Sequence, residues 1–106
     1  MPEAQTGRTY ADKLVQLNLL DGQEKWLLVH VEIQGEPEDD FAKRMYRYNY
    51  RISDKYNKDV ISLAVLTDTN AQFRPNCYEF SLAGCEITFK FPMVKLLDWK
   101  DRLDEL

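Results

Sequence analysis

Two cysteines and one histidine are all that the 106 residues offer of the side chains on which disulfide frameworks and zinc sites depend. This scarcity excludes a disulfide-dense scaffold, and it leaves a four-ligand cysteine and histidine zinc site incomplete within one chain. The four glycines stand apart from one another, so the glycine-rich loops that bind phosphates and dinucleotides are absent as well. We therefore expect no small-molecule cofactor.

Long apolar segments are also missing. No apolar run approaches the roughly 20 residues of a membrane-spanning helix, and the first residues, MPEAQTGRTYADK, lack the apolar segment of a secretory signal. We expect a cytoplasmic protein that does not bind membranes, in which Cys77 and Cys85 stay reduced even if a hairpin brings them face to face. The 14 basic and 18 acidic residues give a net charge of −4, so nucleic acid would have to bind at a local basic patch.

The residues that are present suffice for one folded domain. Hydrophobic residues make up 44% of the chain and aromatic residues 12%, which is more than a disordered segment contains. A chain of this length builds one small core. We expect a single domain over residues 1–106, in which residues 1–9 form a flexible tail.

Two N-terminal segments alternate apolar and polar residues, which predicts strands over residues 10–20 and 25–34. Asp21-Gly22 between them is typical of a turn, so the strands should form an antiparallel hairpin. Their odd-numbered apolar residues should share the buried face, and this condition restricts the register. A register with a three-residue turn meets the condition by forming the pairs Val15–Val29, Leu17–Leu27 and Asp12–Glu32.

Residues 40–56 have the spacing of an amphipathic helix, with Asp39 or Asp40 as the N-terminal cap. The nearly unbroken apolar run over residues 60–66 predicts a buried strand covered on both faces. Because a helix of this length connects the two, this strand should run parallel to the strand over residues 25–34. The buried stripe of the helix consists of Phe41, Met45, Tyr48, Ile52 and Tyr56.

The C-terminal third predicts a second hairpin and a helix. Residues 78–82 and 86–91 alternate weakly and are expected to pair through Ala83-Gly84, and residues 94–106 should form a short helix. Together the elements predict an α/β fold with a mixed sheet.

Asp12 and Glu32 are the main candidates for chemistry. In the expected register their Cβ atoms lie roughly 5 Å apart, and neighbouring carboxylates repel unless a proton or a divalent cation lies between them. Mg²⁺ or Mn²⁺ would suit this pair together with the backbone carbonyl of Ile33. Such an ion lowers the pKa of a bound water and stabilises charge on a phosphate, while Gln34 would orient that water and His30, on the same face, would support the site or relay a proton.

A purely structural interpretation accounts for the same residues. Asp12 and Glu32 would then lie on the wet face of a hairpin, each satisfied by a lysine or by water. His30 beside a carboxylate would make an ordinary structural hydrogen bond. The spacing of the residues does not distinguish this interpretation from the metal site.

A basic side of the predicted helix is the candidate for DNA binding. Spacings of three and four place Lys43, Arg44, Arg47 and Arg51, with Lys55, along one arc away from the buried stripe. Arg44 and Arg47 would hold a phosphate backbone beside the metal site. Tyr46 and Tyr50 lie four residues apart and could stack on bases. The alternative is a solvated helix face.

Six stretches of the chain carry a resemblance to a known family. They are ADKLV from Ala11, LLVHVEIQG from Leu27, FAKRMYRY from Phe41, VISLAVLTD from Val60, Arg74-Pro75, and VKLLDW from Val94. In these stretches, from about Gly7 to Trp99, the chain resembles a bacterial family of recombination-promoting nucleases and transposase-like proteins, members of the PD-(D/E)XK nuclease superfamily with a restriction-endonuclease-like core. The resemblance implies a magnesium-dependent endonuclease of DNA recombination or mobile elements, in which Asp12 and Glu32 bind the metal and Gln34 stands where the motif ordinarily has lysine.

The resemblance also predicts a departure from the family core. That core begins with a helix and a strand before the motif aspartate, and only eleven residues precede Asp12. We expect a core truncated at its N-terminus, with the edge of the strand over residues 10–20 and part of an apolar sheet face exposed. An exposed edge and patch favour pairing, so a homodimer or a pair with a full-length relative is expected. Two functions stay open: an active endonuclease, and a non-catalytic DNA-binding or dimerisation module derived from one.

Overall fold

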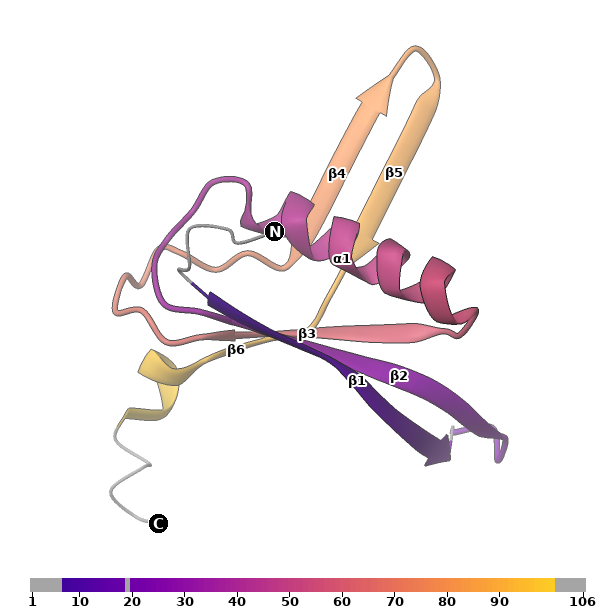
Figure 1. The fold of residues 1–106 in the computed structure, drawn as a ribbon. Helices are drawn as coiled ribbons and strands as arrows, with labels where there is room; N and C mark the ends of the chain where they lie inside the picture. The colour runs from indigo at the N-terminus through magenta and orange to yellow at the C-terminus, as the bar shows by residue number, and fades with distance from the viewer. Residues whose placement is uncertain (1–6, 19, 101–106) are drawn as a thin grey trace.

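The structure is a computed structural model that describes residues 7–18 and 20–100, and for residues 7–18 it describes the backbone alone. One helix and six strands, with a final 3-10 turn, form the described part of the chain (Figure 1). In chain order they are β1 (Gly7–Asn18), β2 (Glu24–Gln34), α1 (Phe41–Tyr56), β3 (Val60–Leu66), β4 (Cys77–Leu82), β5 (Cys85–Lys90), β6 (Met93–Lys95) and η1 (Leu96–Trp99).

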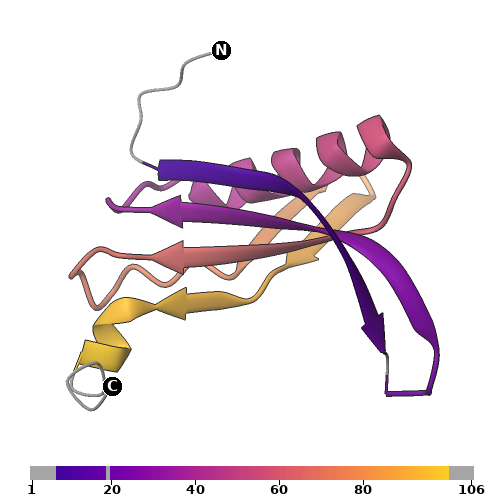
Figure 2. The ribbon, with the colours of Figure 1, turned by 60° about the horizontal axis from the view of Figure 1, so that its bottom comes forward.

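The strands form a four-stranded sheet and a separate hairpin. The sheet has the order β1-β2-β3-β6, in which β1 is antiparallel to β2 and the other neighbours are parallel. Figure 2 shows these four strands side by side, with α1 and the β4–β5 hairpin behind them. The predicted mixed α/β class, the antiparallel first hairpin, the crossover helix and the parallel strand are therefore confirmed.

Helix α1 forms where the apolar spacing predicts it, and its buried residues are Phe41, Met45 and Ile52. Tyr56, the last residue of the predicted stripe, is 47% exposed, so the prediction that it is buried was wrong. Phe41 and Met45 are fully buried against Ala64 and Leu66 of β3, and together with Phe91 these residues form the core cluster. The helix ends at Asn57, whose left-handed backbone (φ 51°) is the conformation that stops a helix at its C-terminal cap. The helix covers one face of the sheet.

The face of β2 that the helix covers is the opposite of the one we predicted. The even-numbered residues Leu28, His30, Glu32 and Gln34 are buried beneath α1, whereas the odd-numbered Val29, Val31 and Ile33 stay partly exposed. The odd-numbered residues of β3 are likewise partly exposed, and Ile61 is 38% exposed, so the expectation that this strand is covered on both faces was wrong. The buried polar face is tolerated because polar groups of α1 and β3 meet it, as described below.

The register of β1 also differs from the prediction. The ladder joins Asn18 to Glu24, so the connection is longer than a three-residue turn and moves the register by two residues. In this connection Asp21 accepts a hydrogen bond from the backbone N–H of Gln23 at 3.0 Å, the local bond typical of such turns. The predicted pairs Val15–Val29, Leu17–Leu27 and Asp12–Glu32 are therefore wrong.

A β-bulge moves Asp12 farther from the predicted position. Tyr10 pairs with Val31 and Lys13 with Val29, so Ala11 and Asp12 together oppose the single residue His30. Thr9, instead of Asp12, is the register partner of Glu32. Because β1 begins at Gly7, residues 7–9 are strand instead of tail, and residues 1–6 lie outside the described residues.

The C-terminal third contains the predicted hairpin and one strand that we did not predict. Residues 93–95 form β6 and residues 96–99 a 3-10 turn, where we expected the start of a helix; residues 101–106 lie outside the described residues. In the hairpin, Cys77 pairs with Lys90 and Cys85 with Leu82, so the two cysteines do not face each other, and both are free thiols. Within residues 7–18 and 20–100, no helix has the length and apolar character to cross a membrane.

Candidate functional site

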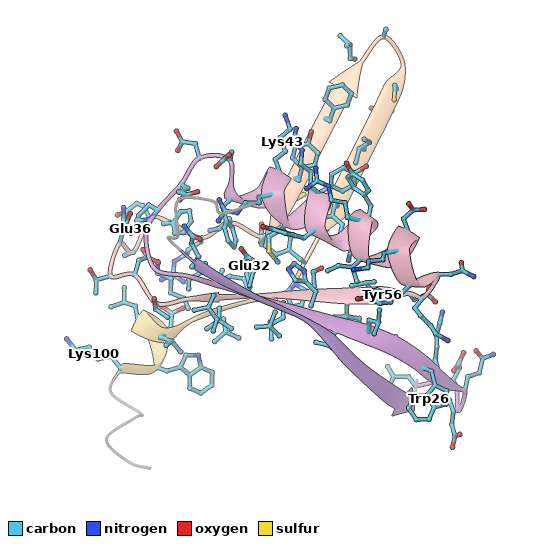
Figure 3. The ribbon with its side chains drawn as sticks, in the orientation of Figure 1. Trp26, Glu32, Glu36, Lys43, Tyr56 and Lys100 are labelled. Atoms are coloured by element: carbon cyan, nitrogen blue, oxygen red, sulfur yellow. The ribbon has the colours of Figure 1, made fainter. Side chains whose placement is uncertain are left out.

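Three buried polar side chains lie in a row on β2 beneath the helix. His30, Glu32 and Gln34 alternate with residues of the opposite face, so they point to the same side of the strand. His30 and Gln34 are fully buried, and Glu32 is 3% exposed. Figure 3 shows Glu32 in the space between α1 and the sheet. The sequence identified all three residues, but it placed them on the solvent-exposed face.

The imidazole of His30 is held by a chain of hydrogen bonds from two other elements. Its Nδ1 lies 2.7 Å from the hydroxyl oxygen of Ser62 on β3. That same oxygen accepts a hydrogen bond of 3.0 Å from the side-chain amide of Asn49 on α1, which also donates to the carbonyl of Val60 at 3.1 Å. The ring also lies beside Tyr48, with centroids 5.5 Å apart. The orientation of His30 is therefore fixed by groups far away in the sequence.

The other ring nitrogen of His30 has no hydrogen-bond partner among the described residues. Nε2 is buried, and the nearest acid is Glu32, whose Oε2 lies 3.5 Å away. This separation is longer than a well-formed hydrogen bond between nitrogen and oxygen. Buried polar atoms are nearly always paired, so an unpaired imidazole nitrogen beside a carboxylate requires an explanation.

Arg44 turns inward from the helix and links the acidic groups around Glu32. Its Nε lies 3.8 Å from Oε1 of Glu32, its Nη1 donates to Glu38, and its Nη2 donates to the amide oxygen of Gln34 at 2.7 Å. We expected Arg44 to belong to an exposed basic patch, and this expectation was wrong. Its guanidinium instead supplies the positive charge that compensates the buried carboxylate.

Gln34 is engaged at both ends of its amide. Its oxygen accepts from Arg44, and its nitrogen donates to the carbonyl of Glu36 at 2.8 Å. The role of Gln34 in orienting a water molecule stays a prediction. In this structure Gln34 positions Arg44.

The other two predicted metal ligands, Asp12 and the carbonyl of Ile33, belong to backbone positions close to Glu32. The bulge of β1 brings Asp12 opposite His30, one register step from Glu32, and the structure does not describe the Asp12 side chain. Ile33 lies between Glu32 and Gln34, paired with Arg8 of β1 and Val65 of β3. Among the side chains that the structure describes, no three of His, Cys, Asp and Glu gather at one point.

The exposed side of α1 carries a row of cations. Lys43, Arg47, Arg51 and Lys55 follow one another at intervals of four residues, and all four are exposed. Successive members lie about 6 Å apart along the helix axis, since each residue rises 1.5 Å. None of the four forms an ion pair with another described side chain, in contrast to Arg44. We call these four residues the cationic row.

Aromatic rings border the cationic row at the foot of the hairpin. Tyr46 stacks on Tyr78 of β4 with centroids 5.2 Å apart, and it also contacts Tyr50 and Phe89. Tyr50 is 45% exposed. Tyr46 thus packs the hairpin against α1, and Tyr50 is the most exposed ring of this group.

Ser62, Asn49 and Glu38 belong to the site but were missed by sequence reasoning. Each acts through a contact with a residue more than five positions away, so no local pattern indicates it. A hollow of about 340 Å³ lies elsewhere, at the foot of the hairpin, lined by Asn76, Cys77, Lys90, Phe91 and Pro92. It includes none of the buried polar residues of β2.

The arrangement holds the guanidinium of Arg44 beside the buried carboxylate between β2 and α1, and it presents exposed positive charge along the cationic row. No protein-family model, curated protein or solved structure matches the chain.

Proposed function

We propose that the chain is a divalent-metal-dependent DNA endonuclease of the PD-(D/E)XK type, linked to DNA recombination or mobile elements. The observation that supports the proposal most is the pair formed by His30 and Glu32. Among the described residues, a buried imidazole nitrogen without a hydrogen-bond partner lies 3.5 Å from a buried carboxylate oxygen. A buried imidazole nitrogen close to a carboxylate oxygen is a combination of donor types that divalent transition metals bind.

The donor atoms suit Mn²⁺ better than Mg²⁺, because imidazole is a poor ligand for Mg²⁺. If Nδ1 of His30 donates its proton to Ser62, the lone pair of Nε2 is available to a metal, and this second hydrogen bond is typical of histidine ligands. In the proposal His30 and Glu32 hold the ion with Asp12 and the carbonyl of Ile33. The bound ion supplies a water of lowered pKa and stabilises negative charge on a phosphate.

The other residues of the site position the ligands and the substrate. Asn49 and Ser62 hold the ring of His30, and Gln34 holds Arg44 so that its guanidinium stays beside Glu32. The cationic row would bind the phosphodiester backbone of DNA next to the site, in the role that we had given to Arg44.

Cleavage of supercoiled plasmid DNA with Mn²⁺ or Mg²⁺ tests this function. The Glu32→Gln variant removes the ligand charge at nearly constant volume, and Glu79→Gln on the hairpin is the matched control. We expect the cleavage rate of Glu32→Gln to fall about 100-fold or more, since mutating residues that only orient metal ligands already lowers activity 10–100-fold. Equal cleavage by wild type and Glu32→Gln, or no cleavage with either metal, would overturn the proposal.

A non-catalytic DNA-binding module is the second candidate. The observation that favours it is the position of Arg44, whose guanidinium lies 3.8 Å from the carboxylate of Glu32 and provides a counter-charge without any metal. This module would bind DNA through the cationic row, with an affinity that neither divalent metal nor Glu32→Gln alters. Electrophoretic mobility shifts with and without EDTA distinguish the two candidates.

A further inference from the structure

The β4–β5 hairpin separates its apolar and polar residues onto two faces. Its cross-strand pairs are Tyr78 with Phe89, Phe80 with Ile87 and Leu82 with Cys85 on one face, and Glu79 with Thr88 and Ser81 with Glu86 on the other. The foot of the apolar face packs on α1 through Tyr46. The far half extends beyond the helix (Figure 1), where Phe80 is 40% and Leu82 66% exposed. A monomer therefore leaves half of an apolar ribbon face in water.

The outer edge of β5 is the second relevant feature. Within the described residues the hairpin is a two-stranded sheet, so neither of its edges is paired. Phe91 donates its backbone N–H to Asn76 at 3.0 Å, toward the β4 side. Because backbone groups alternate along a strand, the N–H and C=O groups of Glu86, Thr88 and Lys90 point away from β4. The edge has no proline and no bulge, two devices that block edge pairing.

We propose that β5 pairs antiparallel with β5 of a second copy of this chain, with Thr88 opposite Thr88 at the two-fold axis. In this register Glu86 of each copy lies opposite Lys90 of the other, so two cross-strand ion pairs form. All the outward backbone groups meet outward groups of the second copy. A lone edge lysine discourages pairing, but here Lys90 faces an opposite charge.

The same register matches the apolar faces. Ile87 of each copy lies opposite Phe89 of the other, so the two hairpins join as one four-stranded sheet with a continuous apolar face. A shift by one residue would place Glu86 opposite Phe89 and mix the two faces. The alternation of the strand and its charges therefore select a single register.

The β4 edge does not offer an equivalent solution. Its outward residues are Cys77, Glu79 and Ser81, so a two-fold pairing at the centre of the strand places Glu79 opposite Glu79. Like charges directly opposite each other are destabilising. The partner is therefore a second copy bound through β5.

The mass of the full chain in solution, measured by sedimentation equilibrium over a wide concentration range, tests the proposal. We expect a reversible dimer of twice the 12.5 kDa chain mass. Glu86→Lys alone and Lys90→Glu alone should each weaken the dimer roughly tenfold or more, since each places two like-charged pairs at the interface. The double exchange Glu86→Lys/Lys90→Glu restores opposite charges and should restore the dimer.

Two further variants keep the test decisive if a charge variant folds poorly. Thr88→Pro removes an N–H that points away from β4, so the hairpin should persist while the dimer is lost. Glu79→Lys makes the same charge change as Glu86→Lys, but on β4, which does not pair with the second copy. This variant should therefore leave the dimer intact. A monomer mass at all concentrations, or a double exchange that fails to rescue, would overturn the proposal. The measurement involves no DNA and no metal, so its outcome is independent of the proposed endonuclease activity.

Discussion

The ammonium group of Lys95 lies 2.7 Å from both carboxylate oxygens of Asp68, and both side chains are buried. Lys95 also donates to the carbonyl of Phe73 at 2.9 Å, so all three of its donors are used. The pair joins β6 to the segment that follows β3. A second bidentate pair, Arg74 with Asp98, lies at the surface close by. The two pairs thus differ mainly in burial.

We expect Lys95→Met to lower the free energy of unfolding by about 3–5 kcal/mol, because it leaves the Asp68 carboxylate buried without a counter-charge. Arg74→Met, which breaks the exposed pair, should lower it by far less, because solvent screens an exposed ion pair. Urea denaturation measures both values. The double variant Asp68→Leu/Lys95→Met should recover much of the loss. Equal costs for the two single variants would contradict this distinction.

The Arg74–Asp98 pair predicts a pH dependence. The hydrogen bond from Arg74 lowers the pKa of the Asp98 carboxyl below its ordinary value. A lowered carboxyl pKa means that the unfolded chain binds the proton more readily, so this contribution to stability is present above about pH 4 and is lost as the pH falls through the lowered value. Thermal melts between pH 2 and 7, in steps of about one unit, should show that the melting temperature of Asp98→Asn falls less at acid pH than that of the wild type. The same decrease in both proteins would refute the assignment to Asp98.

Metal binding should appear as thermal stabilisation. An ion that binds only the folded state stabilises it by about 2.7 kcal/mol at a hundredfold excess over its Kd. We expect Mn²⁺ to raise the melting temperature of the wild type and of the control Glu79→Gln. The shift should disappear in His30→Gln and in Glu32→Gln. A shift that persists in both variants would place the ion elsewhere, and no shift in the wild type would favour the non-catalytic module.

The cationic row predicts how DNA binding responds to salt. Each phosphate contact contributes a slope of about −0.9 to the dependence of log K on log salt concentration. Arg47→Gln/Arg51→Gln should therefore reduce the magnitude of the slope by about 1.8, measured by fluorescence anisotropy with duplex DNA. Lys100→Gln is the control, since Figure 3 shows Lys100 on the opposite side of the molecule from Lys43. Equal slopes for all three proteins would exclude the row from the interface.

Local patterns in the sequence predicted the elements whose causes are local. The spacing of Phe41, Met45 and Ile52 indicates α1, and Asn57 ends it. The second hairpin follows from Ala83-Gly84, both of which have the positive φ of a two-residue hairpin turn. β6 was missed because it has three residues and pairs only with the end of β3, where neither periodicity nor length distinguishes a strand.

The candidate site depended on contacts that no local pattern encodes. His30, Glu32 and Gln34 share one face of β2, as the alternation predicted, but alternation alone does not say which face of β2 the helix covers. The crossover places α1 over the even-numbered face, and Arg44, Asn49 and Ser62 make that polar face acceptable. The position of Asp12 could not be predicted either, because it depends on the length of the turn and on the bulge.

The short length of β6 has a consequence for β3. The N–H of Ala64 points toward β6, where it meets the carbonyl of Pro92 at 3.0 Å, and β6 pairs with residues 64–66 alone. The N–H of Ser62 points to the same side, beyond the reach of the β6 ladder. The rate of amide hydrogen exchange should thus differ along β3, being slow at Ala64 and Leu66 and faster at Ser62. Opening of the sheet should begin at the Ser62 end of the strand.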